Sequence, residues 1–209
     1  VALGPDARTV RQSVATASGE VASVRVVRYD NTAAYDAGLK AYPRAGTLLS
    51  ETSLVRGAAD EPVHLSHTGY RYEAKAGSKP GTWRRQLQAS AATTYEIPGN
   101  ANPQIGQGLM ACLPQAFDAA QTCALGGEQA YQPLTQTSRW LSYDNYGYLV
   151  TEVTRSGEST LLQEHQLKHQ DDLNAYALGL PTLSWSAHEP ASGAGYTLRT
   201  TEYAYYPDG

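Results

Sequence analysis

The sequence predicts an all-β protein built as an antiparallel array of β-hairpins. A long alternation at 83–97 places mostly apolar side chains, from Trp83 to Ile97, at every second position, with polar ones between them. The chain also has 15 tyrosines against one Phe and one Met, and Tyr suits half-exposed pleated surfaces. Turn-forming residues separate the alternating runs. A period of two indicates strands with one buried face, whereas a helix would scatter both sets around its axis.

Shorter alternating runs precede and follow the run at 83–97. In order, we expect strands at 23–30, 64–75, 83–97, 138–144, 148–157, 159–170 and 197–209. The turns that should join them contain Gly, Pro, Asp or Asn and lie at 44–46, 79–81, 144–147, 155–159, 191–195 and 207–209. Strands and turns at this spacing are typical of a hairpin array.

One stretch breaks this rhythm and divides the chain into three parts. Residues 98–137 are rich in Gly, Pro, Gln and Ala, which predicts an irregular insertion loop with a short helix near 114–121. A β-hairpin repeat segment at 1–97 precedes it, and a second β segment at 138–209 follows it. The chain starts without Met and stops in a turn-like YYPDG, so we expect it to belong to a longer polypeptide.

Both cysteines, Cys112 and Cys123, lie in the expected insertion loop. No CxxC pair and no nearby His accompany them, which argues against zinc. A local disulfide would stabilise the fold by about 3 kcal/mol in the chain-entropy model, and it would indicate an oxidising compartment. Two buried free thiols are the alternative.

Several function classes have no support in the sequence. The net charge of −4 provides no basic field for nucleic acid, and no apolar run approaches the roughly 20 residues of a membrane span. Neither a GxSxG nucleophile motif nor a phosphate-binding glycine loop is present. On strands, His64 and His67 would point to opposite faces, and His165 and His169 would lie about 13 Å apart. We therefore expect no catalytic site, no cofactor and no metal ion.

A short element recurs along the chain. Tyr is followed by Asp or Glu at 28–30, 71–77, 142–147 and, in looser form, 204–209, and in the last three copies Gly comes a few residues later. The combination is chemically coherent, because the aromatic ring packs on the neighbouring strand and the carboxylate accepts bonds from its own turn. Gly then takes the positive φ that closes the hairpin.

The ordered motifs from Trp140 to Gly209 resemble the Rhs (YD-repeat) family. The family's YDxxG motif matches Tyr143, Asp144 and Gly147, and its "LLG.P" segment matches Leu178, Gly179, Leu180, Pro181 and Thr182. The terminal YxYxxDG comprises Tyr203, Tyr205, Asp208 and Gly209, with Tyr206 and Pro207 inserted where the family reads directly from Tyr to Asp. The stretch 45–74 is similar to the B component of insecticidal Tc toxins, which belongs to the same wider group.

This resemblance implies a long β-sheet wound as a spiral into a hollow shell that encloses a toxin or an unfolded C-terminal polypeptide. In teneurins a related shell serves cell adhesion. No segment here matches the family's aspartyl-protease-like residues, so the resemblance implies a non-catalytic wall segment of a secreted or cell-surface virulence protein. Its partners would be the rest of the parent shell and the enclosed toxin polypeptide.

A second function remains open from the residues alone. Trp83, Trp140, Trp185 and the tyrosines could form the surface of a secreted binding module, either adhesive or carbohydrate-recognising. Cross-strand aromatic pairs that only stabilise the sheet are the alternative interpretation of the same residues.

Overall fold

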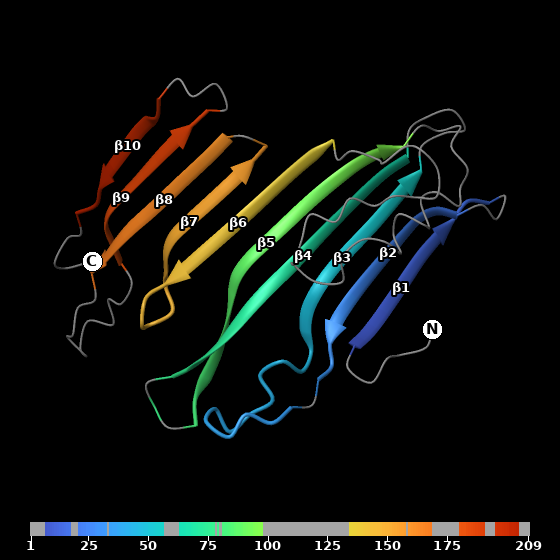
Figure 1. The fold of residues 1–209 in the computed structure, drawn as a ribbon, viewed down its shortest axis with the longest axis horizontal. Coiled ribbons are helices and arrows are strands. Elements are labelled where there is room, and N and C mark those ends of the chain that lie inside the picture. Colours follow the sequence, from blue (N-terminus) through green and yellow to red (C-terminus); the bar gives the residue numbers. More distant parts are fainter. Residues whose placement is uncertain are drawn as a thin grey trace. The chain divides into compact units, whose positions relative to one another are not determined.

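The computed structural model describes residues 7–17, 21–32, 34–56, 63–77, 79, 81–97, 134–157, 159–168, 180–190 and 195–204. Within these residues the protein has ten strands and no helix (Figure 1). The strands are β1 (Ala7–Ala15), β2 (Val21–Asp30), β3 (Thr47–Arg56), β4 (Val63–Ala76), β5 (Trp83–Ile97), β6 (Thr135–Tyr143), β7 (Leu149–Ser156), β8 (Ser159–Lys168), β9 (Leu180–Glu189) and β10 (Thr197–Glu202). The prediction of an all-β antiparallel hairpin array is confirmed.

The chain divides into two compact units, Val1–Gln136 and Thr137–Gly209. The first unit contains β1 to β5, which pair in chain order, each antiparallel to the next (Figure 1). The second contains β7 to β10 and nearly all of β6, paired in the same way. Each unit is therefore a meander of adjacent strands without crossovers.

The core of the first unit is a row of apolar side chains that runs across four strands. Val24 lies opposite Leu54, Leu54 opposite Leu65, and Leu65 opposite Tyr95. All four are buried, and Leu65 is completely so. Side chains that face one another on adjacent strands stabilise a sheet by their mutual contact, so this row fixes the register of β2 to β5.

An equivalent apolar row crosses the second unit. It passes from Trp140 on β6 through Val153 and Leu162 to Ala187 and then Leu198 on β10. The first four are half-buried, whereas Leu198 is 62% exposed. The row therefore ends in a solvent-exposed leucine on the last strand.

The strand at 83–97 was predicted at its observed bounds, since β5 has a clean alternation. Alternation did not predict β1 or β3. In β3 the buried positions include Thr47, Ser50 and Thr52 beside Leu54, so burial and apolarity do not coincide. The strand after the LGLP segment, now seen as β9, followed from the family resemblance alone.

The borders of the expected insertion differ from the structure at one end. We predicted that the loop reaches residue 137, but β6 already begins at Thr135. Three polar residues, TQT, start this strand, and their polarity hid it from the hydrophobic pattern. Residues 98–133 lie outside the described residues, and with them the expected helix at 114–121.

Candidate functional site

The turn between β6 and β7 is built around one carboxylate. Asp144 Oδ1 accepts hydrogen bonds from the backbone N–H groups of Tyr146, Gly147 and Tyr148, at 2.9, 2.7 and 2.9 Å. Gly147 has a φ of 99°, in the left-handed region that favours glycine. The structure thus brings together the predicted motif residues Tyr143, Asp144 and Gly147, and it gives the last two the turn chemistry expected from the sequence.

The first Tyr-Asp copy uses its carboxylate differently. Asp30 Oδ1 accepts from the N–H of Thr32 at 2.9 Å, and Oδ2 accepts from Nε of Arg44 at 2.7 Å. The Asp30 backbone oxygen also accepts from the N–H of Gly46 at 2.7 Å. Its side chain is only 5% exposed. Asp30 therefore fastens both ends of the connection at 31–46 to the end of β2.

Two opposing effects act on the pKa of Asp30. Burial raises it, because a carboxylate is poorly solvated there, whereas the bonds from Thr32 and the ion pair with Arg44 lower it. The lowering effects together outweigh burial, so the pKa lies below the usual aspartate value. The carboxylate consequently stays ionised at neutral pH.

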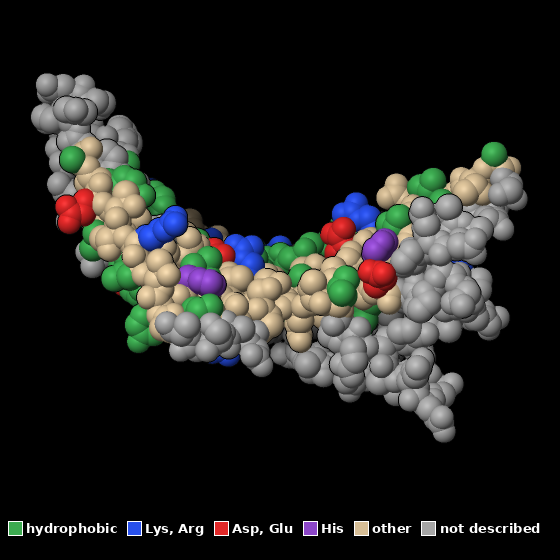
Figure 2. Space-filling model, turned by 90° about the horizontal axis from the view of Figure 1, so that it is seen from above, with side chains coloured by type: hydrophobic (Ala, Val, Ile, Leu, Met, Phe, Trp, Pro, Cys, Tyr) green, Lys and Arg blue, Asp and Glu red, His purple; other side chains and the backbone are tan. Residues whose placement is uncertain are grey.

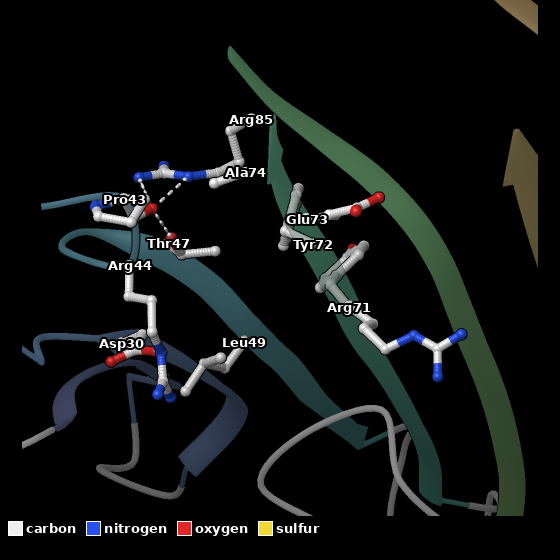
Figure 3. Close-up of a pocket in the computed structure, with 11 residues that line it drawn as sticks. Asp30, Pro43, Arg44, Thr47, Leu49, Arg71, Tyr72, Glu73, Ala74 and Arg85 are labelled. Carbon is white, nitrogen blue, oxygen red and sulfur yellow. Dashed lines mark hydrogen bonds and ion pairs between the residues drawn. The ribbon is translucent and has the colours of Figure 1, made fainter. Parts of the chain in front are cut away.

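A pocket of about 280 Å³ adjoins this first copy (Figure 3). Its lining comprises Asp30, Pro43, Arg44, Thr47, Leu49, Tyr70, Arg71, Tyr72, Glu73, Ala74 and Arg85. In Figure 3 the Arg44 side chain extends to Asp30, and the Arg85 guanidinium reaches the Pro43 carbonyl. No motif in the sequence predicts this pocket.

The basic groups of the pocket hold the chain in place. Arg85 donates from Nε and Nη2 to the Pro43 oxygen, at 3.1 and 2.8 Å, and from Nη2 to the Ala45 oxygen at 3.1 Å. Arg44 forms an ion pair with Asp30. The arrangement anchors a loop on the sheet.

The three copies at 28–30, 71–77 and 142–147 share a cross-strand feature that no sequence pattern had predicted, whereas the Tyr35-Asp36 and Tyr95-Glu96 pairs lack it. In each of the three copies the tyrosine lies opposite a leucine near the start of the following strand. The pairs are Tyr29 with Leu48, Tyr72 with Leu87, and Tyr143 with Leu149. One extra residue then interrupts the ladder as a β-bulge in the second strand; these residues are Leu49, Gln88 and Val150.

The β8–β9 hairpin repeats the geometry with other residues. Leu167 lies opposite Pro181, and Thr182 is the extra residue. Pro181, which was predicted from the LGLP segment, thus occupies the position that leucine takes in the other hairpins. We call the arrangement of an aromatic or Leu, an opposite Leu or Pro, and one extra residue the bulged hairpin.

Within each unit, the second bulged hairpin is displaced from the first by the same step. In the first unit, the first bulge follows Arg28 on β2, which lies opposite Ser50 on β3, and Ser50 in turn lies opposite Gly69 on β4. The next bulge follows Arg71, two residues beyond Gly69. In the second unit, the first bulge follows Ser142 on β6, which lies opposite Thr151 on β7, and Thr151 in turn lies opposite Glu164 on β8. The next bulge follows Gln166, again two residues further. Each two-strand repeat therefore shifts by two residues.

The remaining predicted motif residues are only partly described. Tyr203 follows β10; its N–H donates to the Thr182 oxygen at 3.0 Å, and its hydroxyl lies 3.2 Å from Ser184 Oγ. Seven further residues lie outside the described residues: Leu178, Gly179, Tyr205, Asp208, Gly209, Cys112 and Cys123.

The aromatic residues differ in their surroundings. Trp83 and Trp140 each carry an arginine guanidinium 5.6 Å from the ring centroid, Arg85 and Arg155 respectively. Tyr35 and Tyr42 instead form an edge-to-face pair, with ring centroids 5.3 Å apart, and both are more than half exposed. These two tryptophans thus have partners on the protein, while this tyrosine pair faces solvent.

The described charged side chains form no large single-sign patch on the face in Figure 2. They occur in small groups of both signs among hydrophobic and uncharged side chains. The part of the chain that the structure describes contains no helix with the length and apolarity of a membrane span, and no group of three or more potential metal ligands. Comparisons with protein-family models, curated proteins and solved structures find no match to this chain.

Proposed function

We propose that this chain is a non-catalytic wall segment of an Rhs/Tc-type toxin shell, secreted or on the cell surface. The wall would enclose a toxin or C-terminal polypeptide and protect it from solvent and proteases. The observation that carries the proposal is the recurrence of the bulged hairpin, with the same two-residue step inside each unit. Staggered strand register is what a sheet needs in order to coil or close.

The bulges favour the same interpretation. A β-bulge bends its strand and increases the local twist. Here one occurs in the second strand of each hairpin that carries a repeat copy or its Leu-Pro equivalent. Bends repeated at regular intervals favour a curved wall over a flat sheet, in line with the family that the motifs at 140–209 resemble.

The geometry of the candidate site also favours a structural role. The carboxylates of Asp30 and Asp144 serve their own turns, and Arg44 and Arg85 anchor the connection at 31–46. These groups are occupied in holding loops. We infer that the tyrosine-aspartate copies close and space the hairpins of the wall.

Limited proteolysis of the natural polypeptide that contains this sequence tests enclosure. We expect the cargo segment to stay intact under native conditions at protease concentrations that digest it completely after mild denaturation. Fragments would be assigned by mass spectrometry, and the same cargo expressed alone is the control. Equal cleavage of enclosed and free cargo would contradict the proposal.

The exposed pair of Tyr35 and Tyr42 supports a second candidate, a carbohydrate-recognising or adhesive surface. Two neighbouring solvent-facing rings can stack on a sugar ring. A glycan array with the wild-type chain and a Tyr35→Ala/Tyr42→Ala variant checks this. Binding that disappears in the variant would favour recognition, and an array without signal would remove this candidate.

A further inference from the structure

The last strand, β10, has one unpaired edge among the described strands, since it pairs only with β9. The Tyr203 N–H points to β9, where it donates to Thr182. Backbone groups of successive residues in a strand point to opposite edges. The N–H and C=O groups of Leu198, Thr200 and Glu202 are therefore directed away from β9, toward the free edge.

The repeat specifies what this edge lacks. Each of β2, β4, β6 and β8 is the first strand of a bulged hairpin and is followed by a strand that supplies the Leu or Pro and the extra residue. β10 is the next strand in this alternation. Its side chains, Thr197 to Glu202, are all exposed. Among the described residues, β10 is therefore the first strand of a hairpin whose second strand is not present.

Two further features agree with this assignment. Gln166 lies opposite Leu183, which lies opposite Glu202, and a step of two residues from Glu202 leads to Ala204. The aromatic residue of a bulged hairpin follows the residue reached in this way, and here the sequence has Tyr205. Residue 205 lies outside the described residues, so the count concerns sequence alone. In addition, the apolar row of the second unit ends at Leu198, which is 62% exposed and would be covered by a neighbouring strand.

We propose that the free edge of β10 is a docking site for one antiparallel β-strand of the bulged type. Such a strand has a leucine near its start, then one extra residue, then a run in regular register with its neighbour, as β3, β5 and β7 do. β1 is not the expected occupant, because its sequence ARTVRQSVA contains neither Leu nor Pro. The inference rests on hairpin geometry and names a partner for the proposed wall.

A synthetic peptide with the sequence of residues 147–156, GYLVTEVTRS, is the probe. The matched control is the same peptide without the residue that corresponds to Val150. We expect the full peptide to change the amide NMR shifts of Thr200 and Glu202 in the isotope-labelled chain. The shortened peptide should bind at least about tenfold more weakly. Without the extra residue, its leucine and the residues that follow cannot all lie opposite their partners on β10.

A substitution in β10 tests the edge itself. Thr200→Pro removes an outward N–H while leaving the bonds to β9, and proline is tolerated on such an edge. We expect it to abolish peptide binding, whereas the control Thr200→Val should bind as the wild type does. Circular dichroism checks that both variants fold, and the shift mapping on the wild-type chain is independent of either.

Three outcomes would overturn the inference: no shift at the β10 amides, equal binding of the shortened peptide, or undiminished binding to folded Thr200→Pro. None of them bears on whether a cargo is protected in the natural polypeptide. Conversely, an unprotected cargo together with specific peptide docking would reject the shell and leave the docking edge in place.

Discussion

At the residue scale, Asp144 links the repeat motif to local stability. Its Oδ1 accepts three backbone N–H bonds in the turn between β6 and β7. We expect Asp144→Ala to lower the free energy of unfolding of the second unit by about 1–2 kcal/mol, because these N–H groups lose their acceptor. Urea unfolding followed through amide signals of this unit measures the change.

The matched control is Asp144→Asn, which keeps an oxygen acceptor at the same place. It should retain most of the stability that Asp144→Ala loses. Equal losses in both variants would mean that the charge of Asp144, and not its acceptor geometry, holds the turn.

Asp30 should make the first unit sensitive to acid. Its pKa in the folded protein is lowered, so ionised Asp30 adds stability above the unfolded aspartate pKa of about 3.9. That contribution should disappear as the pH falls from about 4 through the folded pKa. The measurement is the difference in unfolding free energy between wild type and Asp30→Asn, from pH 7 to pH 2. A difference that stays constant over this range would contradict the role assigned to Asp30.

Gln86 is a residue whose replacement should stabilise the protein. It is 5% exposed, and neither its side-chain oxygen nor its nitrogen has a hydrogen-bond partner in the described structure. Because a buried unpaired amide costs about 1–3 kcal/mol, we expect Gln86→Met to raise the free energy of unfolding by about 1 kcal/mol. Gln88→Met is the control and should bring no gain, since Gln88 Nε2 donates to Glu73 at 2.8 Å. A clear loss of stability in Gln86→Met would show that the amide has a function.

At the scale of elements, the bulged hairpin makes the extra residue a structural requirement. Deleting Val150 leaves β7 unable to keep both the Tyr143–Leu149 pair and the pairing of Trp140 with Val153. A one-residue slip moves every side chain to the other face, so we expect a loss of about 2–4 kcal/mol or local unfolding of β7. Hydrogen exchange of the β7 amides reports it. Val150→Thr keeps the residue count and should be nearly neutral; a stable deletion variant would show that the bulge is dispensable.

The sequence was informative where a strand's own residues carry the signal. β5 was predictable because polar and apolar residues alternate in its sequence, although the polar Gln86 and Ser90 are buried. The turn at Asp144 was predictable because its chemistry is local. β3 was not predictable, because its buried positions include the polar Thr52. The burial of Thr52 is possible because its Oγ1 forms a 2.8 Å hydrogen bond with Nδ1 of His67 on β4. A polar residue satisfied by a distant partner has no local signature.

The Tyr–Leu pairs and the pocket escaped prediction for a related reason. Leu149 follows Tyr143 after a tight turn, whereas Leu48 follows Tyr29 only after the long connection at 31–46. No fixed spacing therefore marks the pair. The pocket likewise depends on Arg85 reaching Pro43, a contact between residues far apart in the sequence.

At the scale of the whole molecule, the edge of β10 should make the chain associate. An exposed edge presents unpaired N–H and C=O groups to other chains. We therefore expect a sedimentation coefficient that rises with protein concentration, and a smaller rise for Thr200→Pro than for Thr200→Val. A wild-type chain that stays strictly monomeric at high concentration would contradict an open edge.

The proposed role of the chain, as part of a hollow wall around a polypeptide, can be tested by electron cryo-microscopy of the natural polypeptide that contains it. We predict a closed β-shell in which the strands seen here continue the sheet on both sides and enclose density for a cargo. A separately folded domain with solvent on both sheet faces and no enclosed polypeptide would contradict the account.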